Sequence, residues 1–180
     1  MARVLITGAA GFLGGAVTAR LEARGDDTRG FDVSFGDDVT DAAAFDRALA
    51  SFQPESVVHL AALLTPECAA DPPRAAAVNC VGTAVVLHRS LRSGVRSVVF
   101  ASSVAAIEPG SVYGATKAFG EHLAIALRTE HPDARVIGLR FGWVYGEGRT
   151  RGWNEIQDTI TGFALERAEV RYPEYPEPLD

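Results

Sequence analysis

A tyrosine and a lysine stand four residues apart in the segment YGATK, at Tyr113 and Lys117. The chain holds 17 lysines and arginines, and Lys117 is the single lysine among them. On a helix, residues at this spacing share one face, and an ammonium beside a phenol stabilises the phenolate and lowers the pKa of the tyrosine. The pair therefore points to general acid/base chemistry, although an amphipathic helix with one chance lysine would look the same.

Two serines add to this chemistry, because Ser102 and Ser103 in FASSV close an apolar run that predicts a buried strand. Open α/β sheets bind their ligands outside the carboxyl ends of the strands, and the segment VHLAA ends another predicted strand at that edge. A hydroxyl, a phenol and an ammonium at one sheet edge can together move a proton to or from an alcohol.

Three glycines in TGAAGFLG, Gly8, Gly11 and Gly14, lie between the first predicted strand and the first predicted helix. Glycines at these positions permit a tight turn, the close approach of a pyrophosphate and close packing of helix on strand. Asp32 follows 18 residues after Gly14, at the end of the next predicted strand. Its carboxylate suits the ribose hydroxyls of NAD and would repel a 2′-phosphate, although a turn residue alone would also explain it. The pattern predicts a dinucleotide site.

Short apolar runs alternate with longer Ala-rich or amphipathic segments along the chain. This alternation predicts a parallel sheet with helices on both faces, which is a Rossmann-like doubly wound α/β fold. Strands are expected at 3–6, 28–32, 56–60, 96–101 and 135–140, and helices at 11–24, 41–51, 73–93, 112–130 and 153–166.

Composition argues against several kinds of partner. The formal net charge of −6 disfavours nucleic acid or an anionic membrane surface, and no apolar run reaches a membrane span of about 18 residues. Cys68 and Cys80 do not form a C-x-x-C motif, so two free thiols in a reducing cytoplasm are expected. The four histidines are scattered without metal-ligand spacing, so no metal is expected.

Taken together, these motifs resemble the extended branch of the short-chain dehydrogenase/reductase superfamily, the NAD-dependent sugar epimerase/dehydratase family. The resemblance implies NAD as cofactor and oxidation of a carbinol on a sugar or nucleotide sugar. If the ketone is released, the enzyme is a dehydrogenase. If the keto intermediate rotates and the hydride returns to it, the enzyme is an epimerase. The matching segments, in the family's order over about residues 3–149, are TGAAGFLG, DDVTD, HLAA, VNCVGT, FASSV, YGATKAFGE and LRFGWVYGEGR.

By this resemblance Tyr113 is the acid/base, Lys117 holds the nicotinamide ribose, and Ser103 bonds the reacting oxygen. Asp38 and Val39 are implied to contact the adenine. Ala61 is implied to line the phosphate side, Asn79 to lie near the nicotinamide half and Ser102 to face the cofactor. A hydrogen-bonding role within a helix explains Asn79 equally well. The cofactor-binding set is Gly8, Gly11, Phe12, Leu13, Gly14, Asp32, Asp38, Val39, Leu60, Ala61, Ala62, Asn79, Ser102, Tyr113 and Lys117.

The sequence departs from the family in several places. No Asp-Glu pair follows Ser103, which argues against dehydration, and the segments after Asp32 and between Ser103 and Tyr113 are short. We expect an NAD-binding Rossmann domain at 1–150 and the start of a truncated substrate-binding region at 151–180. A chain of this extent is expected to bind NAD but to turn over sugars poorly. The alternative is a non-catalytic NAD-binding module.

The same resemblance implies a homodimer formed through the expected helices 73–93 and 112–130, because family members commonly pair these two helices. Along the second helix, apolar residues recur at helical spacing, although such a stripe could equally face the core. These residues are Phe119, Leu123, Ala126 and Leu127.

We predict that NAD binds more tightly than NADP, because the carboxylate of Asp32 would repel a 2′-phosphate. Calorimetric titration of both cofactors measures the difference, and Asp32→Ala should narrow it. Tighter binding of NADP would show that Asp32 does not select the cofactor.

Overall fold

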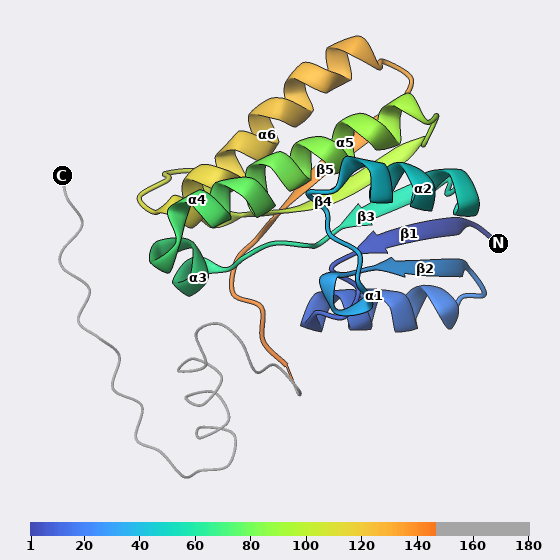
Figure 1. Ribbon diagram of the computed structural model, residues 1–180, viewed down its shortest axis with the longest axis horizontal. Helices are drawn as coiled ribbons and strands as arrows, with labels where there is room; N and C mark the ends of the chain where they lie inside the picture. The colour runs from blue at the N-terminus through green and yellow to red at the C-terminus, as the bar shows by residue number, and fades with distance from the viewer. Residues whose placement is uncertain (147–180) are drawn as a thin grey trace, which may run out of the picture. The chain divides into compact units, whose positions relative to one another are not determined.

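The computed structural model describes residues 1–146, so the expected helix at 153–166 lies outside the described residues. Five parallel strands form one sheet in the order β2-β1-β3-β4-β5, which confirms the Rossmann-like α/β prediction (Figure 1). Residues Met1–Trp143 make one compact unit. The strands are β1 (Arg3–Thr7), β2 (Asp27–Phe31), β3 (Ser56–His59), β4 (Ser97–Ser103) and β5 (Arg135–Phe141).

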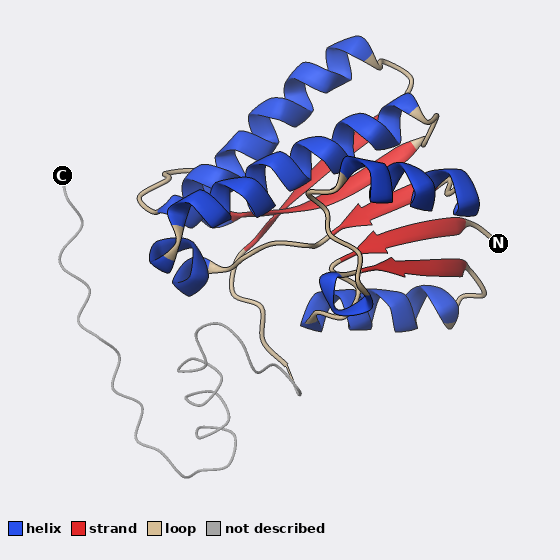
Figure 2. Ribbon diagram, viewed as in Figure 1, coloured by secondary structure: helices blue, strands red, loops and turns tan. Residues whose placement is uncertain are grey.

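Helices cover both faces of the sheet, with α1 on one face and α2, α5 and α6 on the other (Figure 2). The expected helix at 73–93 is an unbroken helical run, but its centre is a wider π-helical turn that the sequence did not reveal. A short helix before it was also not expected. The bounds are α1 (Phe12–Glu22), α2 (Ala42–Phe52), α3 (Thr65–Ala70), α4 (Pro72–Ala75), the π-helical turn (Ala76–Gly82), α5 (Thr83–Arg92) and α6 (Val112–Glu130), with 3-10 turns at Val33–Phe35 and Val104–Ala106.

The main core lies between the sheet and the helices α2, α5 and α6. Phe31 at the end of β2 and Phe45 of α2 are fully buried and meet edge to face, with ring centroids 5.3 Å apart. Full burial of a large apolar side chain contributes about 1.5–3 kcal/mol, so each of these residues stabilises the fold on that scale. The other fully buried members of this core are Leu5, Val57, Val86, Leu87 and Val98. Within residues 1–146, no helix has the length and apolar character needed to cross a bilayer.

Strand β2 forms one edge of the sheet among the described residues. Directly after β2 the chain makes the 3-10 turn at Val33–Phe35 and then enters α2, and no strand within residues 1–146 pairs with β2 on that side. This explains the short segment after Asp32. Among the described residues β5 is the opposite edge, where Ile137 and Leu139 are 43% and 44% exposed.

The glycine loop joins β1 to α1 by close backbone contacts. Gly8 has a left-handed φ of 69°, and a Cβ atom there would lie 2.6 Å from the backbone nitrogen of Ala61. A Cβ atom on Gly14 would lie 2.1 Å from the carbonyl oxygen of Gly8. Glycine is therefore required at both positions, since backbone atoms cannot move aside as a flexible side chain would.

Gly14→Ala should lower the free energy of unfolding by about 1–3 kcal/mol or more, because the methyl group overlaps backbone. The neighbouring Gly15 provides a matched control in the same helix, since a Cβ atom there meets nothing within 4 Å. Gly15→Ala should raise the stability by about 0.5–1 kcal/mol through helix propensity. Urea unfolding followed by circular dichroism measures both. Equal stabilities of the two variants would contradict the close approach of the loop.

Candidate active site

The carboxyl ends of the parallel strands bring the predicted site residues to one edge of the sheet. Thr7 at the end of β1 is paired in register with His59 at the end of β3, and His59 in turn with Phe100 of β4. The arrowheads in Figure 1 show the shared direction of β1, β2 and β3. The glycine loop, the loop after β3 and the end of β4 therefore leave the sheet on the same side.

The glycine loop has the geometry of a phosphate cradle. The N–H of Gly8 donates to the carbonyl of Phe31 (3.0 Å), and the N–H of Gly11 donates to the carbonyl of Gly8 (3.0 Å). Gly11 precedes α1 and caps it without a side-chain hydrogen bond. Phe12 and Leu13 follow as the first residues of α1. N–H groups at such a helix start, approached through glycines, suit a pyrophosphate, so the residues present fit NAD.

Asp32 joins the glycine loop to the end of β2. One carboxylate oxygen accepts a hydrogen bond from the N–H of Ala10 (3.1 Å), and the other accepts from the N–H and hydroxyl of Ser34 (2.9 Å each). A carboxylate has about four lone-pair sites, so acceptor capacity is left for ribose hydroxyls. The ribose contact itself stays a prediction.

Asp38 and Val39 lie in the loop before α2. The carboxylate of Asp38 accepts from the N–H and the hydroxyl of Thr40, both at 2.8 Å. The side chain of Val39 is buried, and a Cβ atom on Gly82 would lie 2.7 Å from its Cγ2. Any adenine contact of Val39 must therefore come from its backbone, and the adenine role of both residues stays a prediction.

Asn79 fixes the loop that follows β3. Its side-chain oxygen accepts from the N–H of Leu63 (2.8 Å), and its amide donates to the carbonyl of Leu63 (3.0 Å) and to the hydroxyl of Thr116 (3.1 Å). Asn79 is only 2% exposed, so its side chain acts as a clamp between this loop and α6. The predicted cofactor contacts Leu60, Ala61 and Ala62 lie in the loop that it holds.

His59 links three elements beneath this edge. One ring nitrogen is 2.6 Å from the hydroxyl of Thr7 and the other 3.0 Å from the hydroxyl of Thr83 on α5. Burial, and to a smaller degree the charge of Lys117, lowers the pKa of His59 to about 3. The imidazole is therefore neutral, which matches one donor and one acceptor role between the two hydroxyls.

Tyr113 and Lys117 share one face of α6, as their spacing predicts. The Nζ atom of Lys117 lies 5.5 Å from the centroid of the Tyr113 ring and donates to the carbonyl of Ala101 in β4 (2.8 Å). Desolvation lowers the pKa of Lys117 to about 8, against the opposing effect of Cys68 and Cys80. The ammonium is still largely protonated at neutral pH.

Ser102 and Ser103 face opposite sides of β4, because side chains alternate along a strand. The Ser103 hydroxyl accepts from the N–H of Ala105 (3.2 Å). The Ser102 hydroxyl is buried and donates to the carboxylate of Glu121 on α6 (2.5 Å). The Ser102 hydroxyl therefore has a partner in the helix layer, and its expected position toward the cofactor stays a prediction.

Comparison with known proteins agrees with this geometry. The model of the NAD dependent epimerase/dehydratase family matches residues 4–171. The chain belongs to this family. UDP-glucose 4-epimerase from Mycolicibacterium smegmatis is 38% identical over 157 residues, covering 76% of this chain and 49% of the relative. dTDP-4-dehydrorhamnose reductase from Streptomyces griseus is 33% identical over 162 residues, which cover 81% of this chain and 51% of that relative.

Solved structures of similar proteins share the fold. A crystal structure of UDP-glucose 4-epimerase from Thermus thermophilus in complex with NAD superposes with a TM-score of 0.78 and 28% identity, covering 93% of this chain and 64% of that one. The chain spans about half the length of the curated relatives described above. The resemblance inferred from the motifs is therefore confirmed at the level of the family.

Glu121 on α6 takes part in the site, although the sequence motifs assign it no role. Its carboxylate accepts two hydrogen bonds from Arg140 of β5, at 2.8 and 2.7 Å, besides the one from Ser102. A signal was present in the sequence, since Glu121 follows Lys117 by four residues as Lys117 follows Tyr113. The partner Arg140 is identified only by the pairing of β5 with β4.

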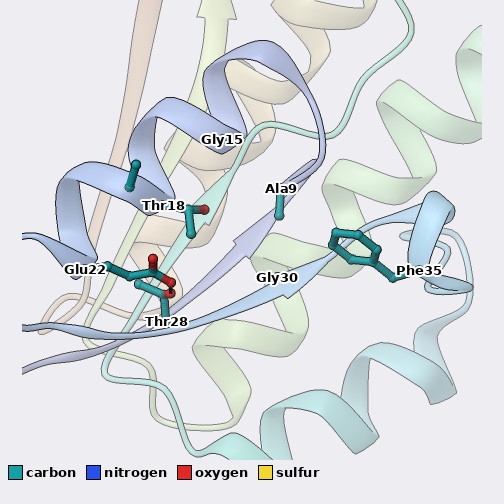
Figure 3. Close-up of a pocket in the computed structure, with 8 residues that line it drawn as sticks. Ala9, Gly15, Thr18, Glu22, Thr28, Gly30 and Phe35 are labelled. Atoms are coloured by element: carbon teal, nitrogen blue, oxygen red, sulfur yellow. Dashed lines mark hydrogen bonds between the residues drawn. The ribbon is translucent and has the colours of Figure 1, made fainter.

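A hollow of about 400 Å³ lies between α1 and β2, apart from Tyr113, Lys117 and Ser103. Figure 3 shows the ring of Phe35 over Gly30 and near Ala9, where a Cβ atom on Gly30 would be 2.9 Å from the Ala9 methyl. In the lining of the hollow the hydroxyl of Thr28 donates to Glu22 (2.8 Å) and the hydroxyl of Thr18 donates to the carbonyl of Gly14 (2.8 Å). Over residues 1–146 no three His, Cys, Asp or Glu side chains gather as a metal site, and the absence of a metal stays a prediction.

Asn79→Ala should lower the free energy of unfolding by about 1–3 kcal/mol, because it leaves both backbone groups of Leu63 without their partner. Asn79→Asp keeps the acceptor for the Leu63 N–H but buries a carboxylate against the Leu63 carbonyl oxygen, so it should be at least as destabilising as the alanine variant. Urea unfolding of the three proteins measures this order. An alanine variant as stable as the wild type would show that water replaces the clamp.

Proposed function

We propose that this chain is an NAD-dependent oxidoreductase or epimerase acting on a carbinol of a sugar or nucleotide sugar. The observation that carries the proposal is the position of Lys117, whose ammonium lies between the Tyr113 ring and the Ala101 carbonyl at the sheet edge. This edge is also where the glycine loop presents its N–H groups. A proton-transfer pair beside a dinucleotide cradle suits oxidation of an alcohol.

The residues that would hold NAD come from separate loops at the sheet edge. The glycine loop from Gly8 to Gly14 would hold the pyrophosphate, Asp32 the adenosine ribose, and Asp38 and the Val39 backbone the adenine. Bound NAD supplies the acceptor for the hydride that leaves the carbinol carbon. The loop at Leu60–Ala62 and the Lys117 ammonium would complete the cofactor contacts.

Tyr113, Lys117 and Ser103 would handle the hydroxyl proton. Tyr113 accepts the proton from the carbinol, and the Lys117 ammonium stabilises the phenolate form that does so. An ammonium has three donors and Lys117 uses one on Ala101, so two remain for ribose hydroxyls. The Ser103 hydroxyl would hold the reacting oxygen.

The relatives support sugar chemistry but differ in outcome, since one is named an epimerase and another a reductase. Whether the ketone leaves or takes the hydride back separates a dehydrogenase from an epimerase. The sequence after Ser103 lacks an Asp-Glu pair, and for this reason dehydration is not proposed.

A non-catalytic NAD-binding module is the second candidate, since the glycine loop and Asp32 would bind NAD whether or not a substrate follows. Under the proposed division, residues 1–150 bind NAD and 151–180 begin a substrate-binding region. NAD binding by calorimetry, run beside a nicotinamide-absorbance screen of sugar acids, aldoses and nucleotide sugars, separates the candidates. NAD binding with oxidation of a sugar supports the oxidoreductase or epimerase, and NAD binding without turnover supports the binding module. A chain that binds no NAD would end both proposals.

We propose a homodimer through the helical run at 73–93, which ends in α5, and the helix at 112–130, which is α6, with no nucleic-acid or membrane partner and a cytoplasmic location. The apolar stripe of α6 divides between two environments: Leu127 is buried in the core, whereas Phe119 is 41% exposed. Exposed apolar residues on this helix suit a partner surface. Light scattering at micromolar concentration tests the dimer, and a monomer would count against it.

Tyr113→Phe should abolish turnover while NAD affinity stays within a few-fold, because the phenol handles protons and contributes little to cofactor binding. Lys117→Arg should lose most activity, because a planar guanidinium cannot replace a compact ammonium between the Tyr113 ring and Ala101. Initial rates and calorimetric titration measure the two effects, in this chain or in a longer protein that contains it. A fully active Lys117→Arg variant would show that the lone lysine has no special role.

A further inference from the structure

We propose that Glu121 is a positioning residue that fixes α6 against the ends of β4 and β5. By doing so, its carboxylate keeps the ammonium of Lys117 against the Ala101 carbonyl of β4. The inference rests on the proposed roles of Tyr113 and Lys117, and its test does not depend on turnover.

Three residues at four-residue spacing form one stripe on α6: Tyr113, Lys117 and Glu121. Two of them bond to consecutive residues at the carboxyl end of β4. Lys117 donates to the Ala101 carbonyl (2.8 Å), and Glu121 accepts from the Ser102 hydroxyl (2.5 Å). The helix that carries the acid/base pair is therefore joined to the strand end by adjacent hydrogen bonds.

Arg140 holds the Glu121 carboxylate in place from the other side. Its Nε and Nη2 atoms donate to the two carboxylate oxygens at 2.8 and 2.7 Å, the fork geometry that fixes a carboxylate in one orientation. These bonds, and more weakly the one from Ser102, lower the pKa of Glu121 to about 2 against the effect of desolvation. Glu121 is therefore ionised at neutral pH and accepts from both partners.

Net stabilisation by the ion pair does not explain this arrangement well. The Arg140 side chain is 51% exposed, and ion pairs with such exposure contribute about 0–1 kcal/mol. The hydrogen bond to Ser102 is different, because Ser102 is 2% exposed and lies in the strand that also accepts from Lys117. Its main physical effect is to fix the position of α6 relative to β4.

The pKa of Lys117 reports the position of α6 relative to β4, because it depends on the groups that surround the ammonium. The titratable groups facing it are the thiols of Cys68 and Cys80, the imidazole of His59 and the phenol of Tyr113. Desolvation is the main cause that lowers the pKa of Lys117 to about 8. Loosening α6 would admit water and raise that pKa toward the ordinary value. Loss of a carboxylate charge, with Arg140 left unpaired, would instead lower it.

Lys117 is the single lysine of the chain, so isotope-labelled lysine gives one side-chain Cε resonance that needs no assignment. We would titrate this resonance in the full chain from about pH 6 to 11, with circular dichroism to confirm folding. Ser102→Ala and Glu121→Ala should each raise the Lys117 pKa by about one unit, a tenfold change in proton affinity. Ser102→Ala removes no charge, so a rise in both variants identifies position as the cause.

Two further variants serve as controls. Glu121→Gln keeps an acceptor for Ser102 but removes the carboxylate charge, so the Lys117 pKa should stay at the wild-type value or fall, and should not rise. Glu130→Ala also removes a carboxylate, at an exposed position of the same helix, and should leave the Lys117 pKa unchanged. If Glu121→Ala does not fold, the comparison of Ser102→Ala with Glu121→Gln decides the question.

The proposal is overturned if the Lys117 pKa is unchanged or lower in Ser102→Ala, or if Glu130→Ala raises it equally. A folded Glu121→Ala variant with an unchanged or lower pKa also overturns it. A chain that binds no NAD and turns over no sugar still gives this titration, so failure of the proposed function is distinguishable from failure of this inference.

Discussion

The candidate active site depends on one ammonium group that has been taken out of water. Lys117 keeps its charge beside the Tyr113 ring because the Ala101 carbonyl, 2.8 Å away, replaces part of its hydration. An unpartnered ammonium in such a place would be strongly disfavoured, so the helix that carries Lys117 must stay at a fixed distance from β4. Much of the structure around the site serves this requirement. The Ser111 hydroxyl caps the start of α6 by accepting from the N–H of Gly114 (3.0 Å), and Glu121 anchors it two turns after Tyr113.

The loops at the sheet edge are held by buried polar side chains, since loops have few apolar contacts of their own. Asn79 clamps the loop after β3 through Leu63, and its wider π-helical turn is the kind of irregular helix geometry that recurs at functional sites. His59 links β1, β3 and α5 through two threonine hydroxyls. A charged imidazole would be disfavoured by burial and by the Lys117 charge, so the network works only with His59 neutral. The pKa of about 3 is consistent with this state.

The opposite side of the site is set by backbone sterics. Gly8 approaches Ala61 and Gly14 approaches Gly8 at distances that leave no room for a side chain. The proposed cradle for a pyrophosphate and the packing of α1 on the sheet therefore depend on the same glycines, and a substitution that disturbs one also disturbs the other. Asp32 adds a polar contact to the same loop through the N–H of Ala10 (3.1 Å).

The sequence by itself determined the fold class, the strand positions and the glycine loop of this protein. These features depend on local constraints: the spacing of apolar residues, the absence of a Cβ atom at Gly8 and Gly14, and the helical repeat that aligns Tyr113 with Lys117. Only the tertiary structure decided the partners of the buried polar groups. The direction of the Ser102 hydroxyl, the clamp of Asn79 on Leu63 and the hydrogen bonds between Glu121 and Arg140 each join separate elements. They depend on the register of packed helices and strands, which no local spacing along the chain records.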